Sequence, residues 1–216
     1  MLAQFLAKEE SIIRKNVLKM GHETNQAIEK AVTCYKTLNI PLADEIIKND
    51  AVINELESRV EAECIQVIAR QQPVANDLRE LLADMNIAKE LERIADYAVS
   101  IAKIVRKLPS KQREIEPEII EMAGKCTIML NEVLFDYAEQ NATKASNVAM
   151  MDDEIDEIEY KLNDKMFKLM QAHPDQAISC TYQLWIIHQL ERIGDRVTNI
   201  AESVVFLATG KVVNFD

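Results

Sequence analysis

Two stretches of the chain, LERIADYAVSIA (91–102) and LERIGDRVTNIA (190–201), are identical at seven of twelve positions. They lie 99 residues apart and share charged as well as apolar residues. A second match appears at a shift of 102, where four residues of the earlier half repeat in the later half: Asp50, Ile53, Glu55 and Glu57 correspond to Asp152, Ile155, Glu157 and Glu159. Chance similarity between helices does not reproduce charged positions so regularly, so the chain is an internal duplication.

Composition predicts that the repeated unit is helical. The 216 residues include only 4 Gly and 5 Pro, too few turn residues for a multi-stranded sheet. Proline is favoured in the first turn of a helix, so Pro41, Pro73 and Pro174 are expected to begin helices. The breaks predict six helices at about 6–38, 41–72, 73–108, 117–140, 142–172 and 174–209. We therefore expect an all-α fold of two tandem three-helix bundles, at residues 1–108 and 117–216, joined by a connector at 109–116.

Charge and motifs exclude several classes of function. The net charge of −11 disfavours binding to nucleic acid or to anionic lipid. No signal peptide, membrane span, phosphate-cradling glycine loop or nucleophile motif is present, so we expect a cytoplasmic protein that is not an enzyme. The cysteines are widely spaced, without a C-x-x-C pair, and are expected to be buried free thiols: Cys34, Cys64, Cys126 and Cys180.

Helical periodicity separates core residues from candidate ligands. Ile53 and Leu91 lie at the centres of the apolar stripes of the second and third helices, and Glu55 points outward. Glu92 and Asp96 lie one turn apart on a flank, where two like charges destabilise an isolated helix slightly unless a cation compensates. Each half thus offers Asp-x-x-x-Asn/Asp and Glu-x-x-x-Asp. The candidate metal ligands are Asp50, Asn54, Glu92 and Asp96 in the earlier half, and Asp152, Asp156, Glu191 and Asp195 in the later half.

A purely structural role remains open for these carboxylates. Arg93 and Arg192 lie beside the two motifs, so the acidic groups could instead form solvated salt-bridge networks. The histidines show neither H-x-x-x-H nor Glu-x-x-His spacing, which argues against a ferritin-like di-iron bundle. His188 is expected to be a surface or satisfied histidine, and Gly194 to allow close helix packing.

Residues 71–103 and 190–210, with the paired LERI-[AG]-D motifs, resemble the PhoU family over about residues 10 to 210. The resemblance implies two three-helix bundles that bind metal through the acidic motifs, from which Asn54 departs. Oxygen ligands favour hard cations, so Mg, Mn, Ca, Fe or Zn are the ions considered. The later half, with Asp156 in place of Asn54, is expected to bind metal more tightly.

Family resemblance also implies a function. It implies a negative regulator of phosphate uptake and of the phosphate-starvation (Pho) response, which contacts the phosphate ABC transporter ATPase (PstB) and a sensor histidine kinase (PhoR). Such a protein would be a homodimer that meets the membrane only through these partners. The alternatives are a metal-dependent phosphohydrolase, which would use the same carboxylates with a metal-bound water, and a metal-storage protein.

Overall fold

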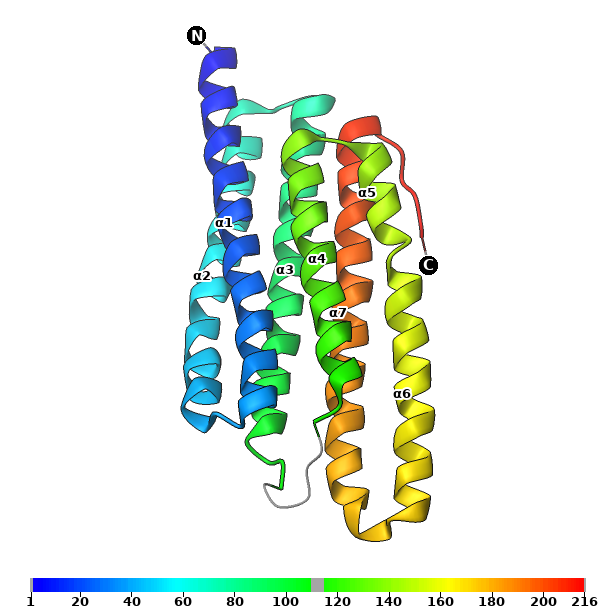
Figure 1. Ribbon diagram of the computed structural model, residues 1–216. Helices are drawn as coiled ribbons and strands as arrows, with labels where there is room; N and C mark the ends of the chain where they lie inside the picture. Colours follow the sequence, from blue (N-terminus) through cyan, green and yellow to red (C-terminus); the bar gives the residue numbers. More distant parts are fainter. Residues whose placement is uncertain (1, 110–114, 216) are drawn as a thin grey trace.

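The computed structural model describes residues 2–109 and 115–215, and within these ranges all regular structure is helical (Figure 1). The connector is therefore mostly outside the described residues. The elements follow one another as α1 (Leu2–Thr37), α2 (Ile40–Gln71), α3 (Asn76–Val105), α4 (Pro117–Glu139), α5 (Ala142–Ala149), α6 (Asp152–Ala172), the 3₁₀ helix η1 (Pro174–Gln176) and α7 (Ala177–Thr209). No described helix is both long and apolar enough to cross a membrane.

Both halves have three long helical segments, which confirms the all-α class and the two three-helix bundles. The first contains α1, α2 and α3, and the second contains α4, the pair α5 and α6, and α7. Central helices α3 and α7 lie side by side, and α1 also contacts α4, so the bundles pack against each other along their length (Figure 1).

One predicted helix is broken. The sequence predicts a continuous helix at 142–172, but the chain turns at Met150 and Met151 between α5 and α6. Three acidic residues, Asp152, Asp153 and Glu154, then occupy the first turn of α6. Carboxylates stabilise the positive end of a helix dipole, so they favour a new N-terminus at this position over continuation of α5.

Two of the three proline predictions also need correction. Pro41 lies in the first turn of α2, as predicted. Pro73 instead precedes α3 in an irregular segment, because the backbone of Ala75 has φ of 50° and the helix begins only at Asn76. Pro174 begins the short η1, and α7 starts at Ala177. Proline fixes its own φ but does not determine the residues that follow it.

The duplication is visible in the turns. Leu38 and Gln140, which align at a shift of 102, end their helices with φ of 54° and 51°. The next residues, Asn39 and Asn141, cap α2 and α5 by accepting hydrogen bonds from Leu42 N and Lys144 N, each at 3.1 Å. Asparagine is a favourable N-cap because its side-chain oxygen satisfies an otherwise unpaired amide. Both copies therefore use the same local chemistry to reverse the chain.

Packing confirms the predicted faces. All predicted stripe residues of the second and third helices are buried, whereas Glu55 and Arg59 are exposed. These buried residues are Ile46, Ile53, Val60, Cys64 and Val67 on α2, and Ile87, Leu91, Ala95, Ala98, Ala102 and Val105 on α3. All four cysteines are buried free thiols, as predicted.

Two buried tyrosines join the halves reciprocally. Tyr35 of α1 donates a hydrogen bond to Gln183 of α7 at 2.9 Å, and Tyr137 of α4 donates one to Asp84 of α3. The tyrosines align at a shift of 102, and Asp84 aligns with Gln183 at a shift of 99. Each half therefore supplies a first-helix donor for a third-helix acceptor of the other half.

Candidate metal centres

The predicted ligands of the earlier half lie between α2 and α3. Burial raises the pKa of Asp50, and the negative charge of Asp96 raises it further. Burial likewise raises the pKa of Glu92, and the negative charges of Asp96, Glu57 and Asp50 raise it further. The positive charge of Arg93 lowers this pKa, but the net shift is upward. Carboxylates of α2 and α3 therefore repel one another across the contact between the two helices. We name Asp50, Glu57, Glu92 and Asp96 the earlier acidic site.

Asn54 contributes differently from its neighbours. Its side-chain amide donates a hydrogen bond to Asp50 Oδ2 at 3.3 Å, and the residue is exposed. The other oxygen of Asp50, Oδ1, is buried and has no hydrogen-bond donor among the described residues. A buried carboxylate oxygen without a donor is costly, and a bound cation would relieve that cost. Asn54 therefore orients Asp50 without supplying a charge.

Arg93 provides only loose compensation in the earlier acidic site. Its guanidinium lies 3.8 Å from Glu92 and 3.9 Å from Asp96, and its side chain is 53% exposed. Such distances exceed those of hydrogen bonds, and exposed ion pairs contribute little to stability. The salt-bridge alternative left open by the sequence therefore exists in the structure as a weak network.

The predicted ligands of the later half lie between α6 and α7. Burial raises the pKa of Glu191 to about 7, and the charges of Asp195, Glu159, Asp156 and Asp152 add to the effect in that order. The other three predicted ligands, together with Glu159, thus act electrostatically on Glu191. A carboxyl group whose neighbours resist its ionisation is a candidate for holding a proton or a cation.

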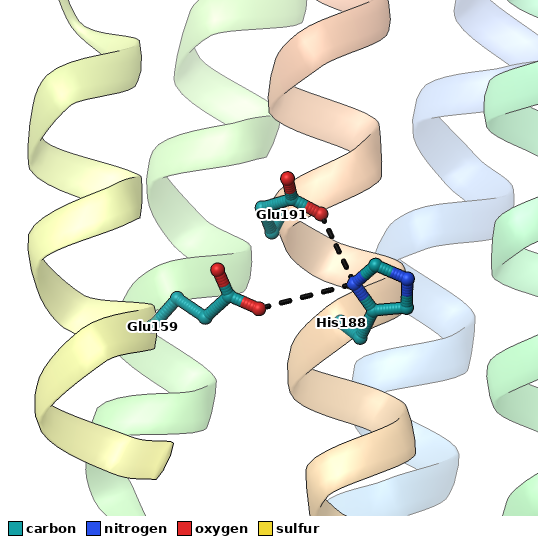
Figure 2. A group of neighbouring side chains, drawn as sticks. All are labelled: Glu159, His188 and Glu191. Atoms are coloured by element: carbon teal, nitrogen blue, oxygen red, sulfur yellow. Dashed lines mark ion pairs between the residues drawn. The ribbon is translucent and has the colours of Figure 1, made fainter. Parts of the chain in front are cut away.

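His188 and Glu159 complete the later cluster, which the sequence reasoning missed (Figure 2). His188 Nδ1 lies 3.2 Å from Glu191 Oε2 and 3.9 Å from Glu159 Oε1. Ligand atoms of the three residues all lie within 4.8 Å of one another. We name Asp152, Asp156, Glu159, His188, Glu191 and Asp195 the later acidic site.

Sequence signals for these two residues did exist. Glu159 aligns with Glu57, and each lies seven residues after the first aspartate of its motif, on the same helical face. His188 precedes Glu191 by three residues, which is the reverse of the Glu-x-x-His order of di-iron bundles. This spacing also places both side chains on one face of the helix. Neighbours on a helix face are found by their spacing of three or four residues, whichever of the two residues comes first in the chain.

Gly194 brings Asp152 close to α7. A Cβ atom built on this glycine would lie only 2.2 Å from Asp152 Oδ1, so the carboxylate occupies the space that a side chain would need. Thr198 donates a hydrogen bond to Asp152 Oδ2 at 3.3 Å. The predicted packing role of Gly194 is therefore supported. The aligned residue of the earlier half is Ala95, so Asp50 has no equivalent space.

The donors present fit a cation. Earlier-site donors are all oxygens, a set that suits Mg²⁺, Mn²⁺, Ca²⁺ or iron. The later site adds an imidazole, and a set of imidazole and carboxylates also suits Zn²⁺. When bound, the ion would supply charge compensation for these carboxylates. Binding of an ion at each site, like the identity of that ion, remains a prediction.

These features define a class of protein: a helical duplication with an acidic cluster between the second and third helices of each copy. The chain belongs to the PhoU family, since the family model for the PhoU domain matches residues 17–105 and 119–204. The matched ranges do not test the domain boundaries that the sequence predicts at residues 108 and 117, so these boundaries stay predictions.

Relatives and solved structures agree with this assignment. A protein of Clostridium acetobutylicum called a phosphate-specific transport system accessory protein PhoU homolog is 34% identical over 94% of each chain. A crystal structure of the phosphate transport system regulatory protein PhoU from Streptococcus pneumoniae is similar with a TM-score of 0.91, at 30% identity over 97% of this chain and 99% of the other. PhoU from Pseudomonas aeruginosa gives the same TM-score at 28% identity, over 95% and 99%.

Proposed function

We propose that this chain is an accessory protein of a phosphate-specific transport system, which lowers phosphate uptake and represses the phosphate-starvation response. The observation that carries the proposal is similarity to proteins named as accessory or regulatory proteins of phosphate transport, at 34% identity over 94% of both sequences in one case. The similarity extends over both repeats of the chain rather than over one of them.

The mode of action that we propose is that of a cytoplasmic, non-enzymatic adaptor. It would act as a homodimer that contacts the transporter ATPase (PstB) and a sensor histidine kinase (PhoR), and would reach the membrane only through them. Similar proteins are named accessory or regulatory proteins, which supports binding rather than turnover. Long rigid helices packed along their length suit such a role, because they present extended surfaces.

Metal binding is the second part of the proposal. The two acidic sites would hold cations between the second and third helices of each bundle. In the metal-free chain the raised pKa values of Asp50, Glu92 and Glu191 reflect burial and repulsion, and a cation would offset both. Metal would thereby hold α2 against α3, and α6 against α7, and fix the surface offered to partners.

A pull-down tests the adaptor proposal. The tagged full-length chain is incubated with detergent-solubilised membranes from cells grown with high or low phosphate, and captured proteins are identified by mass spectrometry. We expect a phosphate transporter ATPase and a histidine kinase, enriched at high phosphate. Asp195→Ala should weaken capture, whereas the matched exposed-surface variant Glu157→Ala should not. Recovery of neither partner would overturn the proposal.

One observation favours a rival, a metal-dependent phosphohydrolase. Glu159, His188 and Glu191 form a cluster in which the His188 side chain is 56% exposed, so a bound ion could keep an open position for water (Figure 2). Hydrolysis of phosphate esters with added Mn²⁺ decides between the two. Turnover that Glu191→Gln abolishes would establish the hydrolase, and the adaptor proposal expects no turnover from either protein.

A further inference from the structure

A basic cleft lies along the seam between the two bundles. It is an open cavity of about 340 Å³ lined by six residues of α3 and α7: Lys89, Glu90, Arg93, Tyr97, Arg192 and Arg196. Arg93 and Arg192 align at a shift of 99, so each half contributes the arginine of its LERI motif to the same cleft. In a chain of net charge −11, four cations beside a single carboxylate are a local exception.

The positive charges of the seam cleft are only partly neutralised by carboxylates of the same chain. Lys89 is exposed, and the nearest carboxylates to Arg93, those of Glu92 and Asp96, lie 3.8 and 3.9 Å away. Arg192 lies over the ring of Tyr97, with 4.7 Å between the guanidinium carbon and the ring centroid. Stacking on an aromatic ring holds a guanidinium in place without neutralising its charge.

Arg196 is held by Glu90, the one acidic residue among the described residues that line the cleft. Its Nη1 lies 3.4 Å from Glu90 Oε2, which also accepts a hydrogen bond from Asn199 at 3.4 Å. This arrangement fixes the arginine and cancels one of the four positive charges. Three positive charges remain, and two of them belong to guanidinium groups from opposite halves.

We infer that the seam cleft binds a phosphate group. Guanidinium groups match the paired oxygens of phosphate or carboxylate, and a phosphate group carries nearly two negative charges at neutral pH, against one for a carboxylate. The remaining charge of the lining favours the more highly charged anion. The ring of Tyr97, already covered by Arg192, is the single aromatic surface in the lining, so there is little to bind the apolar side chains of a peptide.

Two sources could supply this group: free inorganic phosphate, or the phosphates of a nucleotide. Both are recognised by the same chemistry, and the cleft is open to solvent. The inference goes beyond the proposed function, because it concerns the isolated chain and requires neither a partner nor a metal. A negative pull-down would therefore leave it intact, and its own failure would leave the adaptor proposal intact.

Calorimetric titration of the full-length, metal-free chain tests the inference. Inorganic phosphate and ATP are added in separate experiments at constant ionic strength, and acetate serves as the carboxylate comparison. We expect saturable binding of phosphate or ATP at one site per chain, with acetate at least tenfold weaker. Stronger binding of phosphate assigns free phosphate as the ligand, and stronger binding of ATP assigns a nucleotide. No saturable binding of either, or equal binding of acetate, would overturn the inference.

Variants locate the site. Arg93→Gln and Arg192→Gln should each weaken binding by about tenfold, since each removes a positive charge and a pair of parallel N–H donors, the guanidinium fork. Arg192→Lys keeps the charge but loses the fork and should bind with intermediate affinity. The control is Arg59→Gln, an exposed arginine of α2 that is paired with Glu63 at 2.8 Å and lies outside the cleft. Circular dichroism confirms that each variant is folded. An equal loss in Arg59→Gln would contradict the assignment.

Discussion

The two acidic sites occupy the same place in their repeats but carry different donors. At three aligned positions the earlier half has a neutral amide, an ammonium and a methyl group, where the later half has a carboxylate, an imidazole and a hydrogen atom. The pairs are Asn54 and Asp156, Lys89 and His188, and Ala95 and Gly194. Shared caps and shared core residues preserve the helices, so the duplicated backbone permits the two sites to differ in charge, ligand type and depth.

The two buried tyrosine contacts, which correspond to each other in the duplication, also differ in their acceptors. Tyr137 donates to Asp84, a carboxylate, whereas Tyr35 donates to Gln183, a neutral amide. Burial raises the pKa of Asp84 to about 7, and the charge of Glu80 adds to this, while the hydrogen bond from Tyr137 lowers it. Only one of these two tyrosine contacts therefore depends on pH through its acceptor.

The largest effect is expected where the halves are most alike, in their cores. Ile53 and Ile155 are 4% and 0% exposed, so Ile53→Asp and Ile155→Asp each bury an unpaired charge. Both should lower the free energy of unfolding by more than about 4 kcal/mol or prevent folding. Urea unfolding measures this loss. The control, Glu55→Ala, changes an exposed side chain and should have little effect; a similar loss there would show that the assigned faces are wrong.

His188 should distinguish the metals that the two sites accept. His188→Gln removes the one imidazole of the later site, so its affinity for Zn²⁺ should fall about tenfold or more, while its affinity for Mg²⁺, which prefers oxygen, should change little. Competition with a chromogenic chelator gives both affinities. Lys89→Gln, which changes the aligned residue of the earlier half, is the matched control. An equal decrease for both ions would mean that His188 does not contact the metal.

Gly194 should matter for the site more than for the fold. Gly194→Ala places a methyl group against Asp152 and should weaken metal binding at the later site severalfold. Because alanine favours helix by about 1 kcal/mol over glycine, the strain on the flexible carboxylate is partly offset and the stability should change little. Metal titration and thermal melting separate these effects. Unchanged metal affinity would exclude Asp152 as a ligand that needs this space.

The smallest effect is expected from substitution of Asp84, the buried residue that accepts a hydrogen bond from Tyr137. The pKa of Asp84 lies above its ordinary value in the folded protein, so ionising it costs stability as pH rises from about 4 through about 7. Asp84→Asn keeps an acceptor for Tyr137 and should raise the melting temperature by a few kelvin at pH 8 but not at pH 4. Gln183→Glu should create the same pH dependence in the other half, lowering the melting temperature at pH 8 but not at pH 4. Parallel melting curves at both pH values would contradict this account.

The helices and the core followed from the sequence because both depend on local, periodic signals. The stripes around Ile53 and Leu91 are buried as periodicity requires. The interruption at Met150 did not follow, since helix propensity favours continuing there and the acidic first turn of α6 is a feature of one particular helix end. His188 and Glu159 were missed because a site between two helices depends on their relative rotation, which a motif in one helix does not contain.

Titration of Mn²⁺ into the metal-free chain, followed by calorimetry, tests most directly the claim that the duplicated scaffold carries two unequal metal sites. We expect two classes of site, with Asp195→Ala abolishing the tighter and Asp96→Ala the weaker, while Glu157→Ala, an exposed substitution on α6, changes neither. Asn54→Asp should bring the weaker site closer to the tighter one, since it adds a charged ligand. Equal affinities at the two sites, or no binding at all, would contradict the account.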